Sequence, residues 1–229
     1  MAESSYATSS VVNKATLVKA KRIELHEKKS YTILKRCMDI IGASLGIICL
    51  LWLLLIVAIL IKIEDPRGPI FFKQIRVGKN GKKFYMYKFR SMVTNAEEQL
   101  KDLLRFNEIE GAMFKLKDDP RVTKIGKYIR KTSIDELPQL WNVLKGDMSL
   151  VGPRPPLPRE VKEYTEYDIQ RLFVTPGCTG LWQVSGRNNI SFKDMVELDL
   201  KYIKERSIYN DIKIIVKTVV IMFNSKGAY

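Results

Sequence analysis

Residues 40–61 read IIGASLGIICLLWLLLIVAILI and contain no charged side chain. At about 1.5 Å per residue, a helix of this length crosses a hydrocarbon core of roughly 30 Å. The stretch begins some distance into the chain, and no small-residue cleavage site accompanies it, which argues against a cleaved signal sequence. We therefore predict a membrane-embedded helix, around which the rest of the fold is arranged.

Both flanks of this stretch are basic. The basic residues nearest to it are Lys28, Lys29, Lys35 and Arg36 before, and Lys62, Arg67, Lys73, Arg76 and Lys79 after. By the positive-inside rule, both ends favour the cytoplasm. A helix that enters the bilayer, bends and leaves on the same side satisfies both flanks, with Gly42, Ser44 and Gly46 as weak points for bending. A plain span is the alternative, because only the stronger flank needs to decide the orientation.

The whole chain is strongly basic, with 39 Lys and Arg against 25 Asp and Glu, a formal net charge of +14 and a pI near 9.6. This balance indicates a polyanionic partner, which could be nucleic acid, a phosphorylated substrate or an anionic membrane surface. The three separate cysteines suggest neither a disulfide framework nor a zinc site. With His26 as the sole histidine, the chemistry must rest on carboxylates, Lys, Arg, hydroxyls and a hard cation with oxygen ligands.

The rest of the sequence predicts an α+β fold that is mainly helical. A turn signal at 79–81 between two β-branched and aromatic runs predicts a hairpin with strands near 70–77 and 82–89. A capping box of Thr94 and Glu97 predicts a helix that ends at Gly111. Further helices are expected near 122–130, from the segment after Thr132 to Lys145, at 191–206 and at 208–223, whereas VGPRPPLPRE is expected to be loop.

These patterns divide the chain into a mobile basic tail (1–30), a membrane-embedded helix (31–63) and a catalytic domain (64–229). In the last helix, one face carries Ile212, Ile215, Val216, Val219 and Phe223, with lysines beside it. Core packing is one explanation of that face. The other is a C-terminal interfacial helix, lying in the headgroup plane with its lysines toward anionic lipid.

Residues 132–140, TSIDELPQL, place two carboxylates, Asp135 and Glu136, side by side in this basic chain. Ser133 and Glu136 fit a capping box, although Pro138 suits a cap at Asp135 better. Whether Ser133 or Asp135 is the cap, the pair lies at a helix start, which keeps a carboxylate ionised and attracts phosphate. Asp135 is therefore a candidate nucleophile toward a phosphoanhydride. Such an attack needs nearby cations, and the candidates, each of which could also be an ordinary surface charge, are Lys88, Arg90, Arg121, Arg130, Lys131 and Arg154.

Five motifs follow one another along the chain: KRCMDI, GPIFFKQIRVGKNGKKFYMYKFRSM, DDPRVTKIGKYIRKTSIDELPQLWNVLKGDMSLVGPRP, TPGCTGLWQVSGRN and LDLKYIKERSIYNDIKII. Over about residues 31–223 they resemble the bacterial sugar transferases, the monotopic polyprenyl-phosphate phosphoglycosyl transferases that begin surface polysaccharide assembly. The resemblance implies a re-entrant helix at the cytoplasmic face of the bacterial inner membrane. The family usually breaks that helix at a Ser-Pro pair, where this chain has Leu51 and Trp52, so a straighter helix or a true span stays open.

The resemblance also implies a reaction. Asp135 would attack the β-phosphate of a UDP-sugar and release UMP, and a polyprenyl (undecaprenyl) phosphate would then displace the phosphosugar. Glu136, together with Asp135, would hold Mg²⁺. The implied or candidate substrate-binding residues are Lys88, Arg90, Arg121, Arg154, Gln183, Arg187 and Asp199.

The expected partners are a UDP-sugar, polyprenyl phosphate and anionic lipid, without nucleic acid, and a homo-oligomer is left open. GLWQVSGRN is more similar to the members that transfer hexose 1-phosphate, from galactose or glucose, than to those that use acetamido sugars. Three alternatives remain: direct attack by the polyprenyl phosphate with Asp135 as base, a family member without activity, and a non-enzymatic membrane adaptor that binds lipid or nucleic acid by charge.

Overall fold

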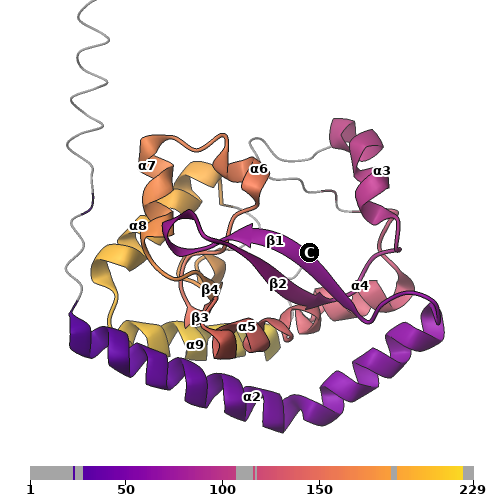
Figure 1. Cartoon of the computed structure of the whole chain (residues 1–229), viewed down its shortest axis with the longest axis horizontal. Coiled ribbons are helices and arrows are strands. Elements are labelled where there is room, and N and C mark those ends of the chain that lie inside the picture. Colours follow the sequence, from indigo (N-terminus) through magenta and orange to yellow (C-terminus); the bar gives the residue numbers. More distant parts are fainter. Residues whose placement is uncertain (1–22, 24–27, 107–115, 117, 187–189, 224–229) are drawn as a thin grey trace, which may run out of the picture.

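The computed structural model describes residues 23, 28–106, 116, 118–186 and 190–223 of the chain. Its longest element is α2 (Lys29–Glu64), an uninterrupted helix of 36 residues. Among the described residues, α2 is the one helix long and apolar enough to cross a membrane. Figure 1 shows that α2 bends near its middle, and that α9, α5 and α4 lie along its concave side.

The bend in α2 needs no proline. The helix is continuous through Leu51 and Trp52, and Trp52 is 76% exposed. Most of its other apolar side chains are exposed as well, whereas Ala43, Val57 and Ile61 are buried against the domain. The concave side of α2 is therefore part of the protein core, and its convex side offers an apolar surface with no protein covering in the described part of the chain.

The predicted hairpin is confirmed. Strand β1 (Phe71–Val77) pairs antiparallel with β2 (Lys83–Phe89), in a register that runs from Phe71 opposite Phe89 to Val77 opposite Lys83. The one-turn 3₁₀ helix η1 (Lys79–Gly81) connects them, with Asn80 at φ 55° and Gly81 at φ 79°. These positive φ values explain the Asn-Gly signal, because both residues adopt the left-handed region at low cost.

The next helices differ from the prediction at their starts. Helix α3 (Ala96–Leu103) follows Asn95, and among the described residues no side-chain bond caps it, so the capping box expected at Thr94 is wrong. It continues into η2 (Leu104–Phe106), while the predicted end near Gly111 lies outside the described residues. Helix α4 (Lys124–Lys131) begins two residues later than expected, where the Thr123 hydroxyl accepts from the Gly126 amide at 2.9 Å.

The segment around TSIDELPQL is broken into short pieces rather than opening one helix. Ser133 adopts a positive φ of 58°, a 3₁₀ turn η3 (Ile134–Glu136) follows, and α5 (Gln139–Lys145) starts after Pro138. In the described part of the chain the Ser133 hydroxyl makes no capping bond, so the predicted capping box is wrong. The predicted end is confirmed, because Gly146 terminates α5 at φ 85°.

The expectation that VGPRPPLPRE is entirely loop is wrong at both ends. Strand β3 (Ser149–Val151) pairs in parallel with β4 (Gly177–Thr179), and α6 (Pro158–Val161) begins at a proline, whose missing N–H costs nothing in the first turn of a helix. Elements α7 (Glu166–Ile169), η4 (Gln170–Phe173) and η5 (Trp182–Val184) follow as short turns.

Two longer helices close the described chain, α8 (Phe192–Glu205) and α9 (Ile208–Phe223), and both confirm the predicted ranges closely. In α9 the face predicted from the sequence is largely exposed: Ile212, Val216 and Val219 are each about half exposed, whereas Ile214 is buried. Ile215, another residue of that face, packs against the core cluster that contains Ile214. Core packing therefore accounts for only part of that face.

Candidate active site

A cavity of about 1560 Å³ lies between α2, the hairpin, the segment from α4 to α5, and α9. Asp135 and Glu136 are in its wall, together with Lys88 from β2 and Arg154 from the loop after β3. Its lining also includes apolar side chains of α2, among them Leu53, and of α9, among them Ile215, Val219 and Met222. The lining of the cavity thus combines charged and apolar side chains.

The two acids lie in η3, where the sharp turn at Ser133 places them. The Asp135 side chain is buried, with 8% of the residue exposed. The Glu136 carboxylate accepts from Lys88 Nζ at 2.5 Å. The backbone is held by hydrogen bonds from the Glu136 amide to the Ser133 carbonyl (3.1 Å) and from the Leu137 amide to the Ile134 carbonyl (3.2 Å). Local backbone bonds and the Lys88 ion pair therefore fix the position of the pair.

The two carboxyls have pKa shifts in opposite directions. Burial raises the pKa of Asp135, and the adjacent Glu136 charge adds to this, although Lys88 acts in the other direction. For Glu136, burial also acts to raise the pKa, but Lys88 and Arg154 outweigh it, and the pKa is lowered. Burial thus opposes the ionisation expected for Asp135 at a helix start, because one 3₁₀ turn has little dipole to offset it. The ionised state of Asp135 in the working enzyme stays a prediction.

Five of the six cations expected near the acids line the cavity, namely Lys88, Arg90, Arg121, Arg130 and Arg154, whereas Lys131 is exposed and is not part of the lining. Two of them are held by neighbouring acids. Arg90 is ion-paired with Asp65, just after α2, and Arg121 pairs with Asp119 at 2.6 Å. These two guanidinium groups are buried and oriented before any substrate binds, while Lys88 and Arg154 set the charge around Glu136.

Arg76 is a buried cavity residue that the sequence reasoning missed as a site residue. Its side chain donates to the Pro155 carbonyl at 3.0 Å and to the Gln74 side chain at 2.7 Å. Burial and the nearby Arg154 charge lower its pKa to about 9. Strand alternation could have found it, because Arg76 and Gln74 share a face with Phe72, and that face lines the cavity.

The sequence model of the family described as "Bacterial sugar transferase" matches residues 30–225. This chain belongs to the bacterial sugar transferase family. It is 54% identical to "Galactosyl transferase CpsE" of Streptococcus agalactiae, and 46% identical to "Undecaprenyl-phosphate galactose phosphotransferase" of Salmonella typhimurium, with 88% of this chain covered in each. It is also 40% identical to "Exopolysaccharide production protein ExoY" of Rhizobium meliloti, over 85% of this chain and 88% of that protein.

This sugar transferase spans less than half of the first two relatives, 44% of the length of CpsE and 43% of the length of the Salmonella protein. Those relatives therefore extend well beyond the matched region. The shared region includes both the apolar helix and the acid pair, since the family match begins at residue 30. The cavity described above thus lies within the part that defines the family.

The remaining predicted site residues are Gln183, Arg187 and Asp199, and they do not all line the cavity. Gln183 lines the cavity and donates from its side chain to the Cys178 carbonyl at 3.2 Å. Arg187 lies outside the described residues. Asp199 is fully buried in α8, is not among the cavity-lining residues, and pairs with Arg171 at 2.7 Å. Its position gives no support to a substrate contact, so that role stays a prediction.

In this sugar transferase, the described residues contain no cluster of three or more metal-ligating side chains. Asp135 and Glu136 nevertheless suit Mg²⁺ by type, because this ion is usually held by one or two carboxylates together with substrate phosphates and water. The buried Asp135 carboxyl, with its raised pKa, is a group whose ionised form a cation would favour. The donor set therefore fits a magnesium site that needs substrate for its completion.

Proposed function

We propose that this sugar transferase is a phosphoglycosyl transferase, which moves a sugar 1-phosphate from a UDP-sugar to polyprenyl phosphate and releases UMP. The observation that carries the proposal is the adjacent pair Asp135 and Glu136 in the wall of a cavity that is also lined by cations and by apolar side chains of α2. The cations suit the phosphates of a nucleotide sugar and of a lipid phosphate, and the apolar side chains of α2 suit the chain of the lipid. The printed names of the Salmonella and Streptococcus relatives agree with this assignment.

The first step forms a covalent aspartyl-phosphosugar intermediate. An oxygen of the Asp135 carboxylate bonds to the β-phosphorus, the bond from that phosphorus to the bridging oxygen breaks, and UMP leaves with that oxygen. The attack joins two anions, so Lys88, Arg154 and Arg76, which line the cavity near the pair, must offset the repulsion. In this proposal Arg90, Arg121, Gln183 and Arg187 complete the substrate-binding set.

The second step returns the enzyme to its starting state. An oxygen of the polyprenyl phosphate bonds to the phosphorus of the intermediate, the bond from that phosphorus to Asp135 breaks, and the carboxylate is regenerated. The product is a polyprenyl-diphospho-sugar. Glu136 and Asp135 would hold Mg²⁺, which supplies neutralisation of phosphate charge when it is bound.

The membrane arrangement belongs to the same proposal. The concave side of α2 lies along the domain (Figure 1), and most of the apolar side chains of α2 are exposed, as a re-entrant helix with both ends on one side requires. Val216 and Val220 of α9 are about half exposed and do not line the cavity, which suits a helix in the interface plane. We place the domain on the cytoplasmic side of the inner membrane, where the basic flanks of α2 favour it.

The proposed substrate is a UDP-hexose, with galactose preferred, and the proposed role is the first membrane step of exopolysaccharide, capsule or O-antigen synthesis. Two of the relatives above carry galactose or galactosyl in their printed names. Another, 42% identical, is named as an N-acetylgalactosaminephosphotransferase. The sugar can therefore be decided by comparing the rates of UMP release from UDP-galactose, UDP-glucose, UDP-N-acetylgalactosamine and UDP-N-acetylglucosamine.

The decisive experiment uses the full chain in lipid nanodiscs with UDP-galactose, Mg²⁺ and undecaprenyl phosphate. We expect UMP release, and intact-protein mass should show a phosphosugar adduct when the acceptor is left out. Asp135→Asn should lose both signals. Asp102→Asn, a change at an exposed acid of α3 away from the cavity, should keep both.

Each negative result has a distinct meaning. If no UDP-sugar of the panel yields UMP with acceptor present, the proposed function is wrong. If UMP appears only after acceptor is added and no adduct forms, the polyprenyl phosphate attacks directly and the covalent intermediate is wrong. An adduct that persists in Asp135→Asn would reject Asp135 as the nucleophile.

A further inference from the structure

Helix α2 holds the C-terminal end of the segment that carries the acid pair. This segment, residues 124–145, consists of α4, η3 and α5. The two terminal nitrogens of Arg36 donate to the carbonyls of Val143 (2.6 Å) and Leu144 (2.7 Å), in the last turn of α5. The Val143 carbonyl also accepts from the Gly146 amide at 3.0 Å. The last carbonyls of a helix lack the usual partner four residues on, and a cation there also complements the helix dipole.

The other end of the same segment is held by the other end of α2. The Glu64 carboxylate accepts from the amides of Lys124 (2.7 Å) and Ile125 (3.2 Å), in the first turn of α4. A carboxylate at a helix N-terminus satisfies free N–H groups and again matches the dipole. Glu64 is the last residue of α2, so one helix contacts both ends of the segment with charges of the appropriate sign.

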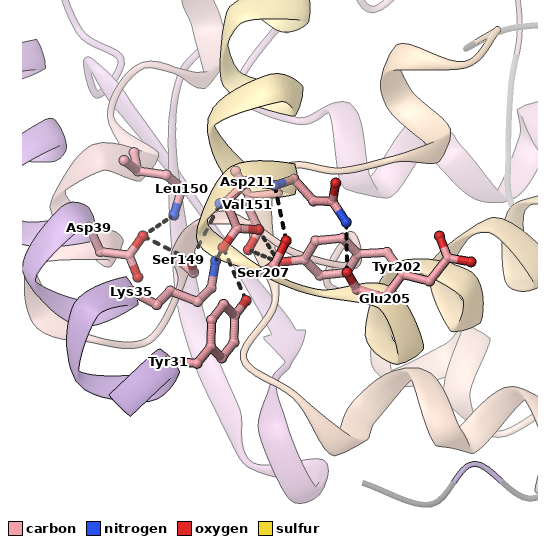
Figure 2. Close-up of polar contacts among 11 residues, drawn as sticks. Tyr31, Lys35, Asp39, Ser149, Leu150, Val151, Tyr202, Glu205, Ser207 and Asp211 are labelled. Carbon is pink, nitrogen blue, oxygen red and sulfur yellow. Dashed lines mark hydrogen bonds and ion pairs between the residues drawn. The ribbon is translucent and has the colours of Figure 1, made fainter. Parts of the chain in front are cut away.

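The N-terminal half of α2 is itself fixed to the domain, as Figure 2 shows. Asp211 of α9 is fully buried and accepts from Lys35 Nζ (2.9 Å), the Tyr31 hydroxyl (3.0 Å) and the Tyr202 hydroxyl (2.7 Å). One turn further along α2, the Asp39 carboxylate accepts from the side chain of Ser149 and the amide of Leu150, both at 2.9 Å. Arg36 therefore reaches α5 from an anchored part of α2.

Between the two contacts, α2 lies close against the domain. A Cβ atom added at Gly46 would be 3.0 Å from a methyl group of Leu140 in α5, and one added at Gly42 would be 2.6 Å from a methyl group of Leu150. Just after the helix, Asp65 holds the guanidinium of Arg90 in the cavity wall. A change in the bend of α2 would therefore move the ends of the acid-bearing segment and Arg90 together.

We propose that α2 positions the reacting groups, with Arg36 and Glu64 as positioning residues that hold the two ends of residues 124–145 and so place Asp135 and Glu136 against Lys88 and Arg154. This inference rests on the proposed function for its kinetic consequence. It goes beyond that function in giving the membrane helix a part in the arrangement of the site. Neither residue lines the cavity, so each acts through the segment it holds.

The test compares Arg36→Met, Glu64→Ala and the double variant with the wild-type full chain in nanodiscs. The matched controls are Lys29→Met and Arg67→Met, which each remove an exposed positive charge beside one end of α2. The kinetic readout is UMP release from UDP-galactose. We expect kcat to fall about tenfold in each single variant with KM within about twofold, because the loss is one of placement rather than binding. Arg36→Lys should keep most of the rate, because its ammonium can still donate to a carbonyl.

A second readout does not depend on activity. Hydrogen–deuterium exchange over residues 132–140 should quicken in Arg36→Met and Glu64→Ala, remain unchanged in both controls, and remain unchanged in the hairpin of all variants. The double variant should lose little more rate than the worse single variant, because one released end already frees the segment.

The proposal is overturned if exchange over residues 132–140 and kcat both match the wild type, or if the exchange increases equally in the hairpin, which would mean general destabilisation. Should either variant fail to fold, Arg36→Gln and Glu64→Gln provide the graded comparison, and wild-type exchange in both would also overturn the proposal. If the wild type releases no UMP, the proposed function fails, while the exchange data still decide whether α2 positions the segment.

Discussion

At the scale of single residues, Asp135 and Glu136 show how burial can separate two neighbouring carboxyls. Glu136 contacts Lys88 directly and has a lowered pKa, while burial and the Glu136 charge raise the pKa of Asp135. The proposed metal ligand is thus ionised over the ordinary pH range. The proposed nucleophile is the carboxyl whose ionisation limits the reaction at low pH.

We expect UMP release to fall as the pH drops through the pKa of Asp135, because the protonated carboxyl cannot attack phosphorus. This fall is the acid limb of the pH–rate profile. Its midpoint should lie above the usual aspartate pKa near 3.9, since the pKa of Asp135 is raised. Lys88→Met removes a charge that lowers that pKa and should move the limb to higher pH. Lys127→Met, at an exposed position of α4, should leave the limb in place. A limb that stays or moves to lower pH in Lys88→Met would contradict this assignment.

The buried pair of Arg171 and Asp199 carries a prediction about stability. Arg171→Met should cost about 3–5 kcal/mol of unfolding free energy, because it leaves a buried carboxylate unpaired. The double variant Arg171→Met/Asp199→Leu should recover most of that loss, which a double-mutant cycle on thermal unfolding would measure. If Asp199 is structural, the folded double variant keeps the wild-type kcat. A folded double variant that releases no UMP would instead support the functional role implied by the family resemblance.

At the scale of elements, helix α2 depends on glycine where it meets the domain. Gly42→Leu should lower the unfolding free energy by about 1–3 kcal/mol, because an added side chain would overlap Leu150. Cys49→Leu places the same side chain on an exposed part of α2 and should change stability little. Thermal unfolding of both variants in nanodiscs makes the comparison, and equal midpoints would mean that the contact with Leu150 is easily rearranged.

The elements also show which sequence patterns are reliable. The hairpin, α8 and α9 follow the prediction closely, because strand alternation, the Asn-Gly turn and the helical spacing are local signals. The start of α3 and the TSIDELPQL segment do not. Serine, threonine and aspartate offer several capping geometries with similar energies, and the packing of the segment against α2 and β2 selects one of them.

At the scale of the whole molecule, the topology of α2 is the main open prediction. We expect both ends of the helix to face the cytoplasm, because Arg36 and Glu64 bind the same segment of one domain. In a variant in which all three cysteines are replaced by serine, Ser30→Cys and Arg67→Cys should both react with an impermeant maleimide in inverted membrane vesicles. Neither should react in intact spheroplasts. Labelling of the two positions from opposite sides would establish a span instead.

The sequence by itself determined the apolar helix, the hairpin, the last two helices and the acid pair as the candidate centre of chemistry. These depend on hydrophobic pattern and residue type, which are properties of short stretches. Only the tertiary structure decided that Asp135 has a raised pKa, that Arg76 belongs to the cavity wall, and that Asp199 is buried beside Arg171. It also decided that α2 bends around the domain and holds residues 124–145 at both ends. The physical reason is that burial and long-range ion pairs depend on contacts between residues far apart in the chain, and no local sequence pattern predicts such contacts.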